Sequence, residues 1–214
     1  MDKQIVVATP FTPHISPARP APAWPAALPV LEGPRATLRE LRREDAGTLL
    51  SLMASPDVAR FISAPPTSVE QFAAFIGWGQ RERIGGRYAG FALLPAGQQG
   101  PAGLLQVRQL DPAFHSAEWG FALSPALWGS GLFGEASRLL LRFAFDVLQV
   151  QRLEARAAVP NVRAHGALRR LGAVQEGVLR SSLVTATGER FDQVLWTILA
   201  SEWRHAAVSA GRVH

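Results

Sequence analysis

The sequence predicts one folded domain of the α/β (α+β) class, with a mixed central sheet flanked by helices. The first observation is size: 214 residues, 48% of them hydrophobic and 18% charged, suffice for one good core and exclude disorder throughout. The second is order, because strand-like and helix-like segments alternate as strand, two helices, three strands, helix, strand, helix and two strands. The third is the presence of hairpin signals between consecutive strands, which favour antiparallel pairing.

Proline spacing sets the predicted domain boundaries. Eight of the 16 prolines fall in the first 34 residues, too densely for a helix or a sheet, so residues 1–34, Trp24 among them, are predicted to form an extended arm or linker. Residues 35–203 then form the folded domain, and residues 204–214 form a C-terminal tail.

The first half of the domain begins with a strand and two helices. Asp45 is the predicted cap of the first helix, and Thr67–Glu70 has the spacing of a capping box that opens the second. The predicted elements are a strand at 36–41, helices carrying Leu49 to Met53 and Phe72 to Ile76, and strands at 88–94, 104–110 and 117–123.

The second half begins with the longest predicted helix, whose apolar residues keep the three-and-four spacing of a buried helix from Gly131 to Val147. The remaining predicted elements are a strand at 153–159, a short basic helix at 162–171 closed by Gly172, and strands at 178–184 and 191–199 around a Thr187–Glu189 turn.

Composition narrows the function classes. The absence of cysteine removes disulfides, thiolate nucleophiles and cysteine-ligated zinc, and we expect no metal site. Charged residues interrupt every long apolar stretch, so no membrane segment is predicted and we expect a cytoplasmic protein. The net charge is +5 and nearly all of the basic residues are arginine, but they are scattered among acids, so we expect no direct nucleic-acid binding. A phosphate-bearing small molecule accounts for the excess equally well.

The glycine-rich segment Gly129–Gly134 is the most informative motif. It reads Gly-Ser-Gly-Leu-Phe-Gly and stands where a strand gives way to a helix. Backbone N–H groups at a helix N-terminus attract anions, so a diphosphate is the expected ligand. The other interpretation is that the glycines only permit a tight turn.

A dinucleotide-binding fold is one way to interpret this loop, and Glu154 lies 20 residues after Gly134, near the spacing of a ribose-binding acid. Three features oppose it. Five residues separate the strand from the first glycine, Glu154 falls at the start of the next strand, and repeated βαβ units are missing. A nicotinamide-dependent oxidoreductase therefore remains a minor alternative.

An ordered series of short motifs extends from the third strand of the middle section to the end of the domain. The series is Glu118–Pro125, Leu127–Leu132, Glu135–Ala136, Asn161, Leu171–Ala173, Gln175–Arg180 and Asp192–Trp196. In this order the motifs resemble the acetyl-CoA core of the GNAT superfamily of N-acetyltransferases, and most of all the branch that acetylates the N-termini of ribosomal proteins. The resemblance covers about residues 35–203.

The resemblance implies a GNAT-like, mostly antiparallel central sheet and an acetyl-CoA donor whose pantetheine lies along the strand that ends at Leu123. The implied cofactor-binding residues are Phe121, Ala122, Leu123, Trp128, Gly129, Ser130, Gly131, Leu132, Phe133, Gly134 and Asn161. The implied partners are the coenzyme A thioester and an amine acceptor, such as a protein N-terminus, with the protein a monomer or homodimer. Phe61, Phe72, Phe75 and Trp78 would line the substrate side or form core.

Direct transfer to the amine is the economical mechanism, because neither a cysteine nor a serine nucleophile motif is present. Glu118 is the predicted catalytic residue, a general base whose flanking rings, Trp119 and Phe121, would raise its pKa by burial. The other interpretation of Glu118 is an exposed strand glutamate or the partner of an arginine. The exposed-looking His115 is a second candidate. Two departures, Ala164 in place of the family's serine and Tyr88 as the sole tyrosine, leave the acid unassigned and keep a non-catalytic acyl-CoA-binding module as an alternative.

Overall fold

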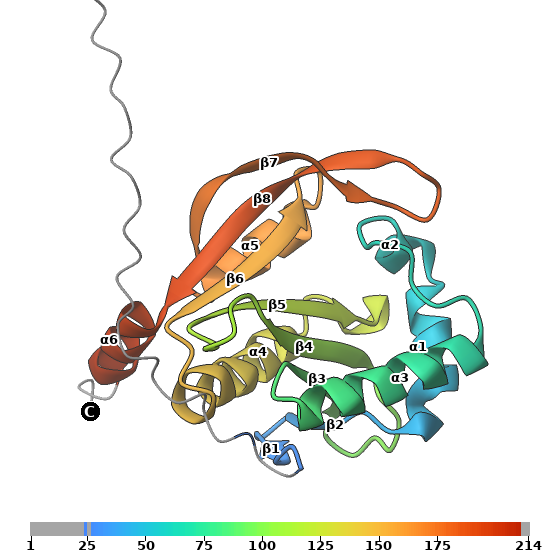
Figure 1. Cartoon of the computed structure of the whole chain (residues 1–214), viewed down its shortest axis with the longest axis horizontal. Helices are drawn as coiled ribbons and strands as arrows, with labels where there is room; N and C mark the ends of the chain where they lie inside the picture. The colour runs from blue at the N-terminus through green and yellow to red at the C-terminus, as the bar shows by residue number, and fades with distance from the viewer. Residues whose placement is uncertain (1–23, 25–26, 211–214) are drawn as a thin grey trace, which may run out of the picture.

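A computed structural model describes Trp24 and residues 27–210, with side chains through residue 205. In this part of the chain one eight-stranded sheet has the order β1-β2-β3-β4-β5-β6-β8-β7 (Figure 1). All neighbouring strands are antiparallel except β5 and β6, which are parallel. The mixed, mostly antiparallel sheet that we predicted is therefore confirmed.

The strands are β1 (Leu31–Glu32), β2 (Ala36–Glu40), β3 (Tyr88–Pro95), β4 (Gly103–Gln109), β5 (Ser116–Leu123), β6 (Arg152–Ala158), β7 (Val174–Val184) and β8 (Arg190–Leu199). The helices are α1 (Ala46–Met53), α2 (Pro56–Ala59), α3 (Val69–Ile84), α4 (Leu132–Arg142), α5 (Val162–Arg170) and α6 (Ala200–Ala210). Short 3-10 turns cover Arg43–Asp45 and Pro125–Leu127, and a π-helical segment, Phe143–Val147, continues α4.

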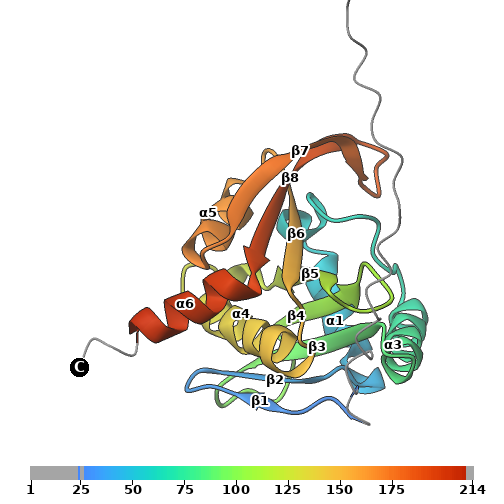
Figure 2. The same ribbon diagram turned by 60° about the vertical axis from the view of Figure 1, so that its left-hand side comes forward.

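Helices cover both faces of the sheet. Helix α4 packs on one face, where Leu140 and Phe143 join sheet residues such as Phe91 and Trp119 in the main core. Helices α1 and α3 pack on the other face of β2–β4 around Leu49 and Phe72 (Figure 2). The three-and-four spacing of α4 predicted this burial, and the sheet alternation supplies the two apolar faces that the helices need.

The folded region extends beyond the predicted domain boundaries. In the segment predicted to be an arm, Leu28 is buried, Leu31–Glu32 forms β1, and the Trp24 ring packs edge-on against Phe114 at 5.2 Å between centroids. Apolar residues between the prolines, Trp24, Leu28 and Leu31, pack with the main core, so folded structure begins before residue 35. The rest of the predicted arm, residues 1–23, 25 and 26, lies outside the described residues. At the other end, α6 runs to Ala210, beyond the predicted tail boundary at residue 204.

Two predicted helix starts differ in detail. Ser68, rather than Thr67, caps α3 by accepting a hydrogen bond from the backbone N–H of Gln71, and the Gln71 side chain accepts the backbone N–H of Thr67 in return. The predicted capping box is therefore only half formed, because the Gln71 side chain bonds the residue before the cap and not the cap itself. Asp45 precedes α1, but its side chain does not cap this helix and forms an ion pair with Arg39 instead.

The Arg39–Asp45 ion pair ties β2 to the start of α1. The Nη1 and Nη2 atoms of Arg39 each donate to the Asp45 carboxylate at 2.7 Å, and the Arg42 backbone N–H donates to it at 2.8 Å. Burial opposes ionisation of Asp45, but these hydrogen bonds outweigh it and hold the pKa of the carboxyl below its ordinary value.

We expect Asp45→Asn to lower the free energy of unfolding by about 3 kcal/mol at pH 7, because it leaves a guanidinium buried without its counter-charge. A carboxyl with a lowered folded-state pKa stabilises the fold above its unfolded pKa and loses that contribution as the pH falls through the folded value. Urea titrations should therefore show the wild-type advantage shrinking below about pH 4. The exposed neighbour Glu44 offers the control Glu44→Gln, and an equal loss in that variant would contradict the ion-pair explanation.

Two negative findings hold for the residues that the structure describes. Their helices include none with the length and apolar character of a membrane span. They also contain no group of three or more histidine, aspartate or glutamate side chains arranged to hold a metal ion.

Candidate functional site

Strands β5 and β6 separate soon after they meet. Their parallel pairing joins Ser116–Glu118 to Arg152–Glu154, and within the described chain β5 has no further partner on that side up to Leu123 (Figure 1). The other side of β5 is paired with β4 along its length. One edge of residues 119–123 therefore presents backbone N–H and C=O groups that an extended ligand can pair with, apart from the Leu123 carbonyl, which already accepts a side-chain hydrogen bond from Trp128.

The glycine loop follows β5 and caps α4. Gly129 and Gly131 have φ of 78° and 81°, in the left-handed region, and Gly131 occupies the cap position. Ser130 is tied into the loop, since its hydroxyl donates to the Leu127 carbonyl at 2.7 Å and accepts the Leu132 N–H at 3.3 Å.

The loop leaves several backbone donors without partners. Among the described residues, none accepts a hydrogen bond from the N–H groups of Gly129, Gly131, Phe133 or Gly134. Gly129 and Gly131 are also exposed. Unpaired N–H groups at the positive end of an eleven-residue helix form a site for an anion such as a diphosphate. The loop therefore fits the phosphate group that the sequence predicted.

Aromatic side chains flank the loop. The rings of Phe121 and Phe133 lie 4.5 Å apart between centroids, and Phe133 stacks on Trp119 at 6.5 Å. These contacts connect the α4 side of β5 to the first turn of α4. Phe133 and Phe121 are half-buried, and both pack against the main core.

Trp128 connects the loop to both β5 and α5. Its indole N–H donates to the Leu123 carbonyl at 3.0 Å, and the Arg163 guanidinium lies over its ring at 3.8 Å from the centroid. This cation–π contact places the first turn of α5 against the loop, across from the end of β5. Trp128 thus connects the predicted cofactor-binding residues of the loop to the end of β5, and Arg163 brings the start of α5, which Asn161 precedes, against the loop.

Asn161 lies where β6 has ended and α5 begins. Its side-chain oxygen accepts the backbone N–H of Ala164 at 3.1 Å, so it is the helix cap. In the described part of the chain its side-chain amide nitrogen has no acceptor. Asn161 therefore keeps a donor for a ligand while it caps the helix.

Glu118 lies on β5 at the last residue pair before the strands separate. Its side chain shares a sheet face with Arg108, and the Arg108 guanidinium donates to Glu118 Oε2. The remaining oxygen, Oε1, has no partner among the described residues. The Glu118 side chain is 19% exposed.

The predicted surroundings of Glu118 were wrong. Trp119 and Phe121 lie on the opposite, α4-covered face of β5, because successive side chains of a strand alternate between faces. The neighbour of Glu118 is a guanidinium, so apolar rings do not surround the carboxylate. Residues next to each other in a strand point to opposite faces, so Trp119 and Phe121 could not have been the surroundings of Glu118.

A second carboxylate, Glu154, pairs with Glu118 across the parallel ladder. Its Oε1 accepts a 2.9 Å hydrogen bond from Arg152, whose other nitrogens bind Glu176 at 2.8 and 2.5 Å. The hydrogen bond from Arg152, supported by one from Thr197, lowers the pKa of Glu176 to about 2. The sheet face beside the strand separation is therefore charged and internally paired.

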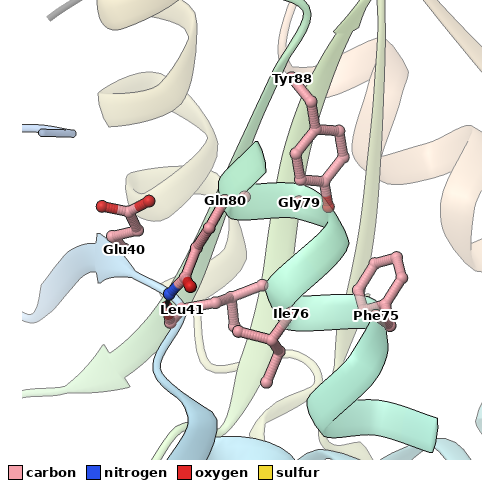
Figure 3. A pocket seen from close by; sticks show the side chains of 8 residues that line it. Glu40, Leu41, Phe75, Ile76, Gly79, Gln80 and Tyr88 are labelled. Atoms are coloured by element: carbon pink, nitrogen blue, oxygen red, sulfur yellow. Dashed lines mark hydrogen bonds between the residues drawn. The ribbon is translucent and has the colours of Figure 1, made fainter. Parts of the chain in front are cut away.

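Tyr88 is unsuited to donate a proton at this site. It is 3% exposed, and its hydroxyl donates to Gln106 Oε1 at 2.7 Å. Burial raises the pKa of its phenol. It lines a cavity with Phe75, Ile76 and Gly79, which Figure 3 shows between α3 and β3, with the Gln80 amide pointing to the Leu41 carbonyl.

That cavity is only about 10 Å³, room for one water, so it holds no substrate. An open groove of about 370 Å³ lies between α5 and β7–β8, lined by His165, Arg169 and Trp196 among others. The glycine loop lines neither of them. The loop is exposed at the surface. An exposed loop can still bind a long cofactor that stays partly in solvent.

The other sequence candidates have different positions. His115 is exposed and faces Asp111 at 3.9 Å, outside the separated part of β5. Phe72 is buried core, whereas Trp78 is 41% exposed and stacks on Phe75. Phe61 reaches the β7–β8 hairpin and contacts Phe191 at 5.8 Å between centroids.

Arg35 is the residue that sequence analysis missed. Its guanidinium donates to the Ser130 carbonyl of the loop from 95 residues earlier in the chain. No local motif signals such a contact, because it depends on β1–β2 folding next to α4.

A mixed, mostly antiparallel sheet, with a glycine loop between β5 and the helix that follows it, agrees with the acetyltransferase core that the sequence motifs resemble. The family model described as acetyltransferase (GNAT) domain matches residues 35–174, and the chain belongs to this family of N-acetyltransferases.

Curated relatives carry acetyltransferase names. The uncharacterized N-acetyltransferase p20 of Bacillus licheniformis is 27% identical over 170 residues, 79% of this chain and 95% of that protein. A Bacillus subtilis (strain 168) protein with the provisional name ribosomal N-acetyltransferase YdaF is 31% identical over 101 residues, 47% of this chain and 55% of the relative.

Solved structures share the fold. A protein from T. thermophilus, provisionally described as an acetyltransferase, has a TM-score of 0.71 at 31% identity, covering 88% of this chain and 99% of its own. Mycobacterium smegmatis RimJ in complex with CoA-disulfide has a TM-score of 0.73 at 23% identity, covering 86% of this chain and 94% of that chain.

Proposed function

We propose that this protein transfers an acetyl group from acetyl-CoA directly to a primary amine, and that the acceptor is a protein N-terminal α-amino group. The observation that carries the proposal is the separation of β5 from β6 beside a glycine loop with unpartnered N–H groups. The acceptor class is supported by the Bacillus subtilis relative whose provisional name refers to ribosomal N-acetylation.

In this proposal, different parts of one acetyl-CoA molecule bind to the glycine loop, to β5 and to Asn161. In this proposal the N–H groups of the Gly129–Gly134 loop hold the diphosphate, and the free edge of β5 at Phe121–Leu123 pairs with the pantetheine. The Asn161 amide, at the start of α5, donates to a pantetheine carbonyl from the side opposite β5. When bound, acetyl-CoA supplies an activated thioester.

Glu118 is the proposed general base. A protein amino terminus has a pKa of about 8 and is mostly protonated at pH 7, so it must lose a proton before it can attack. Glu118 Oε1 is unpartnered among the described residues and lies at the point where β5 and β6 separate. The contact with Arg108 fixes the carboxylate while this oxygen accepts the proton, directly or through water.

Incubation with acetyl-CoA and peptide panels tests the proposal. Thiol release and mass spectrometry should show one acetyl group on the α-amine of peptides with free N-termini, and none on the same peptides blocked at the N-terminus. Spermidine and an aminoglycoside in parallel distinguish other amine classes. Turnover on those amines alone would contradict the protein acceptor, and failure to bind acetyl-CoA would contradict the whole proposal.

A non-catalytic acyl-CoA-binding module is the second candidate, favoured by two observations. Tyr88, the sole tyrosine, is buried against Gln106, and Ala164 stands in the position where the family has serine, so no side chain is assigned to protonate the thiolate. This candidate predicts coenzyme A binding with no turnover on any amine. The nicotinamide alternative requires a doubly wound parallel sheet, whereas the described sheet has one parallel pairing.

A further inference from the structure

The turn between β1 and β2 lies against the glycine loop. The guanidinium of Arg35 donates to the Ser130 carbonyl at the tip of the loop. The same guanidinium lies beside Gly131, where an added Cβ would be 3.3 Å from its Nη1 atom. A residue from the N-terminal part of the domain thus reaches the centre of the proposed diphosphate site.

The backbone of this turn is held on α4. Glu135, in the first turn of the helix, accepts the backbone N–H of Arg35 at 2.7 Å and of Ala36 at 3.0 Å through one carboxylate oxygen. Gly33 lies so close that a Cβ there would be 2.6 Å from this oxygen. Glu135 therefore fixes the origin of the Arg35 side chain relative to the N-terminus of the helix.

Arg35 retains donors and charge for a ligand. Its side chain is exposed, and the described residues provide it with one acceptor, the Ser130 carbonyl. The unpartnered N–H groups of Gly129 and Gly131 are neighbours of that carbonyl in the chain. A guanidinium has several donors in a planar fork, which matches two oxygens of a phosphate.

We infer that Arg35 is a cofactor-binding residue that contacts the diphosphate of coenzyme A, in addition to the loop N–H groups. This inference rests on the proposed function, because it assumes that the loop holds this cofactor. Arg35 then recognises the diphosphate, the part that coenzyme A shares with dephospho-coenzyme A, and does not recognise the 3′-phosphate.

Isothermal titration of the full chain with coenzyme A and with dephospho-coenzyme A tests the inference. Arg35→Gln should weaken both ligands by the same factor, about 10- to 100-fold, which is the range for a lost charge-assisted hydrogen bond. Arg35→Lys should recover part of the loss, since it restores the charge without the fork. The exposed Arg142 at the other end of α4 gives the matched control Arg142→Gln, which should leave both affinities unchanged.

The outcomes distinguish a failure of the proposed function from a failure of the inference on Arg35. If wild-type protein binds neither ligand, the proposed function fails. If wild-type binds both and Arg35→Gln binds them equally well, the inference on Arg35 fails and the proposed function stands. A loss confined to coenzyme A would mean that Arg35 contacts the 3′-phosphate, which also overturns the inference. Thermal unfolding of each variant shows whether the fold is kept.

Discussion

Replacing Glu118 by glutamine is expected to lower kcat for peptide acetylation about 100- to 1000-fold, the usual contribution of a general base. The KM for acetyl-CoA should change little, because the base acts on the amine. The deficit should shrink as the pH rises from about 7 to about 9, since the acceptor amine is then deprotonated without assistance. A pH series of initial rates for wild type and variant measures both effects.

Glu154 provides a matched control for this experiment. It pairs with Glu118 across the ladder, has similar exposure and is also held by an arginine. Glu154→Gln should keep kcat within about threefold of wild type, because a carboxylate that only pairs with a neighbour contributes little to the reaction. If Glu118→Gln retains near-wild-type activity, or if both variants lose activity equally, Glu118 is not the base.

Replacing Gly131 by valine is expected to weaken coenzyme A binding at least about 100-fold. Its φ of 81° is strained for any residue with a Cβ and most of all for a β-branched one. The new side chain would also press on the Arg35 guanidinium, 3.3 Å from its Cβ, and stand among the free N–H groups of the loop. Titration calorimetry with coenzyme A measures the loss.

A valine at Gly97 serves as the control that distinguishes the effect of backbone strain from an effect on the cofactor site. It has φ of 77°, lies at the β3–β4 connection and has no atom within 4 Å of an added Cβ. Gly97→Val should therefore cost about 1–3 kcal/mol of stability, as a strained backbone does, and leave coenzyme A affinity unchanged. Equal affinity losses in the Gly97 and Gly131 variants would show that the loop has no specific role.

Much of the fold was predictable because its signals are local. The spacing of apolar residues predicted α4, and the Thr187–Glu189 turn signal predicted the hairpin between β7 and β8. The glycine loop was identified for the same reason, because adjacent residues indicate both a left-handed backbone and the start of a helix. The ordered motifs from Glu118 to Trp196 then identified the family.

Features that depend on long-range packing were not predictable in this way. The contact of Arg35 with Ser130 requires two segments 95 residues apart to meet, and no local pattern encodes it. The partner of Glu118 is Arg108, which a neighbouring strand supplies, so residues adjacent in sequence gave the wrong surroundings. Asp45 has the chemistry of a helix cap, yet the competing Arg39 pair determines its role.

The most direct test of the central claim is a crystal structure of this protein with coenzyme A. Our account predicts diphosphate oxygens within hydrogen-bond distance, about 2.7–3.2 Å, of the N–H groups of Gly129, Gly131, Phe133 or Gly134. It also predicts that the pantetheine extends along the free edge of β5, toward Glu118. A coenzyme bound elsewhere, with these N–H groups contacting only solvent or protein, would contradict the account.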